Sequence, residues 1–187
     1  MSNQNSIVIV SAKRSPIGSF QGAISSVPAT KLGSLVISKI LEDTMIDNSL
    51  IDEVIMGNVL SAGIGQAPAR QAALGAGLPD TVECLTINKM CGSGLKAVML
   101  AAQGIQVKDA NIIIAGGFEN MSQAPYLISK ARNGYRLGHG DLVDSLISDG
   151  LWDVYNDMHM GSCAEICARD RNYTISDQND FAKESYR

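Results

Sequence analysis

The sequence predicts an α/β layered domain in which strands and helices alternate in the order β-α-β-α-β-α-β, followed by a mostly helical loop region. Two observations carry this prediction. Short β-branched runs alternate with apolar residues at helical spacing over residues 7–117, whereas residues 120–151 are rich in glycine, serine and asparagine and show no sustained period. We therefore place the α/β core over residues 1–117 and an incomplete loop region over residues 118–187.

Four runs of apolar and β-branched residues account for the expected strands. They cover residues 7–11, 54–60, 84–88 and 111–115. Stretches with helical spacing separate each strand from the next, as a layered α/β domain requires.

Three helices are expected between these strands. Apolar residues at helical spacing predict the first over residues 32–40. The second is alanine-rich, with Pro68 in its first turn and Gly75 or Gly77 at its end. The third covers residues 92–107.

The loop region has two helix-start signals. Ser162 and Glu165 have the spacing of a capping box, and Ser176 is a candidate cap for a last helix. That helix still runs at Arg187 with no stop signal, so we expect the chain to be a fragment of a longer protein.

Composition and charge exclude several classes of protein. Of 187 residues, 45% are apolar and 18% are charged, which excludes a mainly disordered chain. The net charge of -4 has the wrong sign for a general nucleic-acid surface. The apolar run over residues 7–10 is too short for a signal peptide or a membrane span, so we expect a cytoplasmic protein with neither nucleic-acid nor membrane partners.

Four cysteines are too few for a secreted disulfide scaffold, so free thiols are expected. His159, Cys163 and Cys167 have a spacing that could share one helical face and hold a metal ion. However, Gly161 and the Ser162 cap place the helix start after His159, and no fourth ligand is evident, so we expect no metal site.

Two further alternatives concern binding loops and thiol chemistry. The glycines at 63 and 65 lack the third glycine of a dinucleotide-binding fingerprint, and the sequence has no phosphate loop. A redox-sensing role of Cys91, with Cys84 as the resolving thiol, stays open.

The most informative stretch is residues 88–94, where an expected strand turns into a helix with Cys91 at the junction. Unpaired N–H groups and the helix dipole favour a thiolate there, and a backbone N–H could donate to an oxyanion. Gly92 and Gly94 have no Cβ, which lets a bulky acyl group approach. The alternative is a small buried thiol beside glycines that serve close packing, and spacing alone does not decide.

Four segments together resemble one family. They are Gly-Gln-Ala-Pro-Ala-Arg-Gln at 65–71, Asn-Lys-Met-Cys-Gly-Ser-Gly at 88–94, Gly-Gly-Phe-Glu-Asn-Met-Ser at 116–122 and His-Met-Gly-Ser-Cys-Ala-Glu at 159–165. In this order and approximate spacing they resemble the thiolases, the acyl-CoA acetyltransferases, over essentially the whole chain.

The resemblance implies an acyltransferase that works through an acyl-cysteine on Cys91, with a coenzyme A thioester as substrate and no cofactor. Two acetyl-CoA molecules condense to acetoacetyl-CoA, or a 3-ketoacyl-CoA is cleaved. The family's acid/base residues stand in Gly-His-Pro and Cys-x-Gly motifs, which residues 1–187 do not contain, and neither His139 nor His159 has that context. We expect no turnover from this chain alone; the alternative is a catalytically silent acyl-CoA-binding or assembly fragment.

The resemblance also implies substrate-binding residues in the loop region. His159 and Met160 match a pair that lines the acyl pocket, although His159 could instead only close a loop–helix junction. Residues 146–156 and 181–186 resemble the potassium-activated acetoacetyl-CoA thiolases. In that subgroup the counterpart of Tyr186 contacts the cation and the coenzyme A site; the alternative is an ordinary exposed helix residue.

Other residues are expected to support the site or the assembly. Asn88, Gly92 and Gly94 shape the turn around Cys91. A cation in the first turn of a helix opposes the dipole, so we expect Arg70 to pair with Glu119 behind that turn.

The family also implies assembly contacts, although a solvated basic loop is the alternative for the first of them. Residues 129–139, with Lys130, Arg132 and Arg136, match a loop that joins two dimers, so we expect a dimer or tetramer. One helix face of the core would pack on a second copy of the α/β unit in the same subunit, which leaves an apolar patch on this chain.

Overall fold

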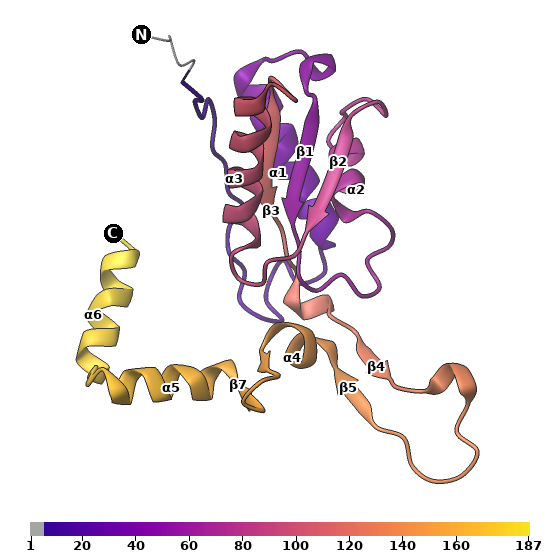
Figure 1. Ribbon diagram of the computed structural model, residues 1–187, viewed down its shortest axis with the longest axis vertical. Coiled ribbons are helices and arrows are strands. Elements are labelled where there is room, and N and C mark those ends of the chain that lie inside the picture. The colour runs from indigo at the N-terminus through magenta and orange to yellow at the C-terminus, as the bar shows by residue number, and fades with distance from the viewer. Residues whose placement is uncertain (1–5) are drawn as a thin grey trace. The chain divides into compact units, whose positions relative to one another are not determined.

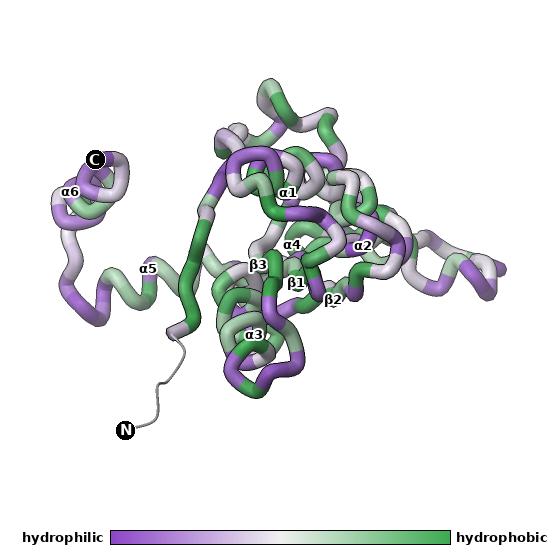
Figure 2. Tube along the Cα trace, turned by 90° about the horizontal axis from the view of Figure 1, so that it is seen from above, coloured by the Kyte–Doolittle hydropathy of each residue, from purple (hydrophilic) through white to green (hydrophobic). Residues whose placement is uncertain are grey.

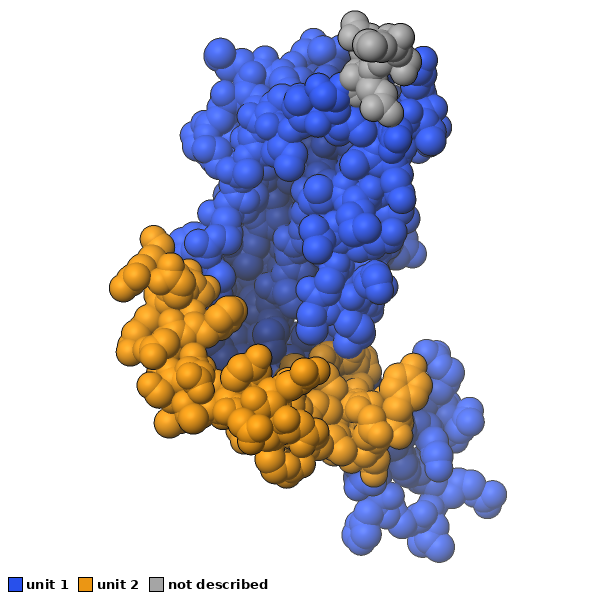
Figure 3. All heavy atoms as spheres, turned by 60° about the vertical axis from the view of Figure 1, so that its left-hand side comes forward, with its two compact units in different colours: residues 1–146 blue, residues 147–187 orange. Residues whose placement is uncertain are grey.

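The computed structural model describes residues 6–187 and divides into two compact units, residues 1–146 and residues 147–187 (Figures 1 and 3). The first unit contains the α/β core and a hairpin. The second contains short strands and two helices. Each unit is described by itself.

A three-stranded parallel sheet with the order β2-β1-β3 forms the centre of the first unit. The strands are β1 (Glu53–Gly57), β2 (Glu83–Ile87) and β3 (Ile113–Gly117). Val54 of the central strand lies between Cys84 and Ile114 in the register. Because the strands are parallel, their carboxyl ends and the turns that follow them meet at one edge of the sheet.

Helices cover both faces of this sheet, α1 (Ala29–Thr44) and α2 (Pro68–Gly75) on one side and α3 (Ser93–Val107) on the other (Figures 1 and 2). Successive side chains of β1 point to opposite faces, so Val54 packs with α1 and α2, whereas Ile55 packs with α3. The alternation expected from the sequence therefore builds a three-layer core, as predicted.

The first of the expected strands does not form. Residues 7–11 are extended but pair with no other strand among residues 6–187. Their apolar side chains are exposed, from 40% at Ile7 to 78% at Ile9 (Figure 2). The prediction is wrong because β-branched composition favours an extended backbone, whereas a strand also needs a neighbour that supplies hydrogen bonds.

The rest of the first unit is made of short elements. The 3₁₀ turns are Asn48–Leu50, Met121–Gln123 and Ala131–Asn133. An antiparallel hairpin consists of β4 (Tyr126–Ile128) and β5 (Leu142–Asp144), and the loop with the basic residues joins its strands. The division predicted at residue 117 stays a prediction.

The second unit begins within α4 (Ser145–Gly150) and continues with the antiparallel pair β6 (Trp152–Asp153) and β7 (Met158–His159). Two helices follow, α5 (Met160–Asp170) and α6 (Ile175–Ser185). Within residues 6–187, no helix has both the length and the apolar character needed to cross a membrane.

Both helix caps predicted in the second unit are wrong. His159 caps α5, because its Nδ1 accepts a hydrogen bond from the Gly161 N–H at 3.0 Å. Thr174 caps α6 through a reciprocal box with Asp177, so Ser176 lies inside the helix. In both places a nearer side chain satisfies the free N–H groups one turn earlier than the serine would.

Candidate active site

Cys91 lies on a tight turn that leads from the end of β2 into the start of α3. All five residues from Asn88 to Gly92 are exposed, and Ser93 is the first helical residue. The turn is closed by its own hydrogen bonds. Gly92 N–H donates to the Lys89 carbonyl at 3.1 Å, and the Asn88 side-chain oxygen accepts from Met90 N–H at 2.9 Å.

The Cys91 thiol is exposed, which excludes the interpretation of a small buried residue. Cys84, on the neighbouring strand, is half-buried, and this burial raises the pKa of its thiol. The two thiols of this unit therefore differ in access. Among the cysteines of the core, only Cys91 stands at the amino end of a helix and is open to a substrate.

Glycines bring the first turn of α3 against the ends of the central strands. A Cβ on Gly57 would lie 2.6 Å from the Ser93 Cβ, and Gly117 lies 3.5 Å from the Gly94 Cα. The missing Cβ at Gly94 thus faces the sheet and serves close packing, which was the alternative explanation. At Gly92 the nearest atom to an added Cβ is the Lys89 carbonyl oxygen at 3.5 Å, so this side of the turn is open.

The predicted pair between Arg70 and Glu119 does not form. The Arg70 guanidinium donates instead to the main-chain carbonyls of Asp80 at 2.9 Å and Val82 at 3.2 Å. These carbonyls satisfy the cation and tie α2 to the loop that enters β2. The pairing was therefore wrong, and a supporting role of the two residues in the site stays a prediction.

Glu119 joins the turns that follow β1 and β3. Its carboxylate accepts from the Asn58 amide at 2.6 Å and from the N–H groups of Val59 and Leu60 at 2.9 and 3.3 Å. Burial raises the pKa of Glu119, and these hydrogen bonds oppose that rise. Asn58 is 2% exposed, and its N–H donates to the Ile87 carbonyl, immediately before the Cys91 turn.

Sequence reasoning missed Asn58 and Ser93 as residues of this edge. Both had a visible signal, because each is a polar residue beside the end of a buried strand or the start of a helix. Polar side chains at the carboxyl edge of a parallel sheet are common constituents of sites.

The second unit holds His159, Met160 and Tyr186. His159 and Met160 are adjacent at the start of α5, where His159 closes the loop–helix junction with its ring nitrogen. Tyr186 follows α6 and is 94% exposed. Because α5 begins at Met160, His159 does not share a helical face with Cys163 and Cys167, and residues 6–187 bring together no three potential metal ligands.

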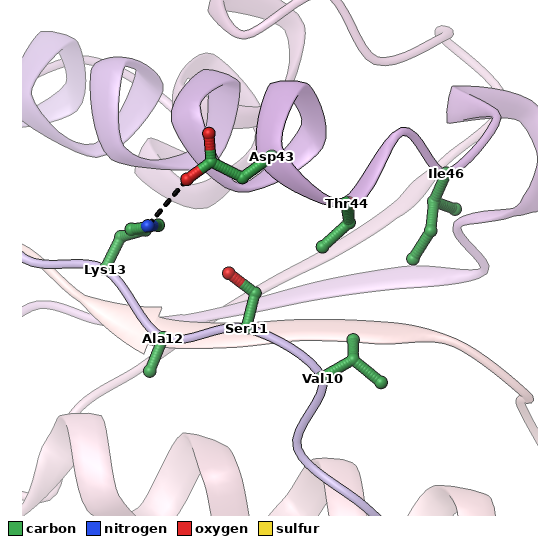
Figure 4. A pocket seen from close by; sticks show the side chains of 7 residues that line it. All are labelled: Val10, Ser11, Ala12, Lys13, Asp43, Thr44 and Ile46. Atoms are coloured by element: carbon green, nitrogen blue, oxygen red, sulfur yellow. Dashed lines mark ion pairs between the residues drawn. The ribbon is translucent and has the colours of Figure 1, made fainter.

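Two hollows lie elsewhere on the described surface. One is lined by the N-terminal segment and the end of α1, where Lys13 and Asp43 form an ion pair at 2.6 Å (Figure 4). The other lies in the hairpin loop and includes Lys130, Arg136 and His139. Neither hollow is lined by Cys91.

An α/β layer with an exposed cysteine between a strand and a helix defines the class of enzymes that form covalent intermediates on a thiol. A family model described as "Thiolase, N-terminal domain" matches residues 7–187. The chain therefore belongs to the thiolase family, as the four sequence segments predicted.

Named relatives agree with this family. The chain is 54% identical over 184 residues to acetyl-CoA acetyltransferase 2 of Arabidopsis thaliana, covering 98% of this chain and 46% of that protein. It is 55% identical over 179 residues to acetyl-CoA acetyltransferase of Pseudomonas aeruginosa, covering 96% and 46%. It is 50% identical over 182 residues to the mitochondrial acetyl-CoA acetyltransferase of Bos taurus, covering 97% and 43%. The chain thus spans less than half the length of these relatives.

Proposed function

We propose that this chain supplies the nucleophile of an acetyl-CoA C-acetyltransferase. The observation that carries the proposal is the exposed Cys91 thiol at the amino end of α3, in a chain of the thiolase family. The relatives' names supply the substrate class, and the open side of the turn at Gly92 gives a thioester room to approach.

The reaction has two steps, which divide one difficult transfer into two easier ones. The Cys91 sulfur, after losing its proton, attacks the carbonyl carbon of an acyl-CoA. A new carbon–sulfur bond forms as the bond to coenzyme A breaks, and coenzyme A leaves as the thiol. A second acetyl-CoA, deprotonated at its α-carbon, then attacks the acyl group and releases Cys91 with acetoacetyl-CoA as the product. The reverse sequence cleaves a 3-ketoacyl-CoA.

We assign further roles on the same basis. His159 and Met160 line the acyl pocket, and Tyr186 contacts coenzyme A and an activating potassium ion. The loop over residues 129–139 contributes to a homodimer or homotetramer in the cytoplasm. The general base and the second cysteine come from the part of a thiolase subunit that residues 1–187 do not include.

Acetyl-CoA incubated with the chain tests the nucleophile. We expect an acetyl group on the peptide that contains Cys91, detected by mass spectrometry, and none in Cys91→Ala. The matched control Cys167→Ala, which removes another exposed thiol, should keep the adduct. Absence of the adduct in the unmodified chain would favour the catalytically silent acyl-CoA-binding or assembly fragment.

A second assay tests the need for the missing acid/base residues. The isolated chain should show no thiolysis of acetoacetyl-CoA, followed by the loss of its absorbance. Measurable turnover that disappears in Cys91→Ala would overturn this part of the proposal.

A further inference from the structure

The Ser93 hydroxyl closes the turn that carries Cys91. Ser93 is 5% exposed, and its Oγ accepts from the Lys89 N–H at 2.9 Å and donates to the Met90 carbonyl at 2.5 Å. One hydroxyl therefore contacts the main chain of both residues that immediately precede Cys91. Its two bonds use its donor and one of its acceptor positions.

Ser93 is itself held in place by the sheet. An added Cβ on Gly57, the last residue of β1, would lie 2.6 Å from the Ser93 Cβ. The serine thus lies between the end of the central strand and the exposed turn, and it connects a buried element with residues that make few other contacts.

The turn needs such a connection because its backbone is unfavourable. Met90 has a φ of 48°, in the left-handed region that non-glycine residues adopt at a cost. Its neighbours from Asn88 to Gly92 are exposed, so packing contributes little to holding this conformation. Hydrogen bonds carry that task, and Ser93 supplies the two that link the turn to the core.

We propose that Ser93 is a positioning residue for Cys91, whose hydroxyl fixes the turn so that the sulfur meets the thioester carbonyl at the amino end of α3. The inference rests on the proposed function. Removing the hydroxyl would leave Cys91 exposed and α3 formed, but it would release the sulfur from a single position. Acyl transfer depends on that position, whereas reaction with a small alkylating agent depends mainly on access.

The test compares two reactions of Cys91 in Ser93→Ala. The chain is treated with acetyl-CoA or with iodoacetamide, and the rate at the Cys91 peptide is followed by mass spectrometry. We expect acetylation to fall about tenfold, the effect of losing about two ordinary hydrogen bonds, while alkylation stays within about twofold. Ser34→Ala is the matched control, because Ser34 is equally buried and donates to the Thr30 carbonyl within α1, away from the turn.

The other thiols serve as internal references. Exposed Cys167 reports the reagent's activity, and half-buried Cys84 becomes reactive if the core opens. Should Ser93→Ala unfold by this criterion, Asn88→Ala replaces it. That change removes only the exposed 2.9 Å bond to Met90 N–H and should also lower acetylation relative to alkylation.

Each outcome has a separate meaning. Equal changes in acetylation and alkylation, or no change in either, would overturn the positioning role of Ser93. A chain whose Cys91 is alkylated but never acetylated, before any substitution, would instead overturn the proposed function.

Discussion

The two units of the molecule are stabilised in different ways. The first unit contains the buried residues of both apolar clusters, on either side of a parallel sheet. In residues 147–187 no side chain is buried, and α5 and α6 are held by caps and by exposed ion pairs three residues apart. Exposed pairs of this kind contribute little, so local sequence decides the second unit, whereas packing decides the first.

The largest expected difference lies in the core. Ile37 on α1 is 1% exposed, and Ile37→Ala should lower the free energy of unfolding by about 3 kcal/mol because it leaves a cavity. The same substitution at Ile175 on α6, which is 72% exposed, should change it by less than about 0.5 kcal/mol. Urea unfolding followed by circular dichroism measures both. Similar losses at the two isoleucines would show that the second unit also has a packed core.

A smaller effect is expected at the cap of α6. Thr174→Ala removes the side chain that accepts from the Asp177 N–H and should destabilise this helix by about 1 kcal/mol. Amide hydrogen exchange should increase in α6 and stay unchanged in α1. The control is Ser176→Ala, because Ser176 lies inside the helix, where alanine is at least as favourable. If Ser176→Ala has the larger effect, the cap has been assigned to the wrong residue.

The smallest effect is a pH dependence of opposite sign in the two units. Burial raises the pKa of Glu119, so the stabilisation that its proton brings is complete below about pH 4.3 and is lost as pH rises through the folded pKa. The bonds with Thr174 lower the pKa of Asp177, so its contribution is present above about pH 3.9 and is lost as pH falls through the folded pKa.

Unfolding of the core and exchange in α6, measured between about pH 3 and 6, should separate these responses. Glu119→Gln should remove the first, and Asp177→Asn should remove the second. A core whose stability only rises with pH over this range, unchanged in Glu119→Gln, would contradict the effect of burial on Glu119.

Much of the core could be predicted because its signals are periodic. The alternation along β1 and the helical spacing of α1 each identify a buried face from neighbouring residues alone. The position of Cys91 followed from the same pattern, since a strand, a glycine and a helix succeed one another within a few residues.

The errors concern choices among several partners. Arg70 had acceptors in both carboxylates and main-chain carbonyls, and only the path of the chain before β2 placed the carbonyls of Asp80 and Val82 within reach. Similarly, Thr174 and Ser176 are both good caps, and the backbone selected the first.

The amino-acid sequence by itself determined the three-layer core, the family and the cysteine at the strand-to-helix turn, because periodicity and short motifs are local properties of the chain. Only the tertiary structure decided that residues 7–11 remain unpaired, that Gly94 faces the sheet and that Ser93 closes the turn around the nucleophile. Those features depend on which segments meet in space, and hydrogen bonds and close packing between distant residues leave no period in the sequence.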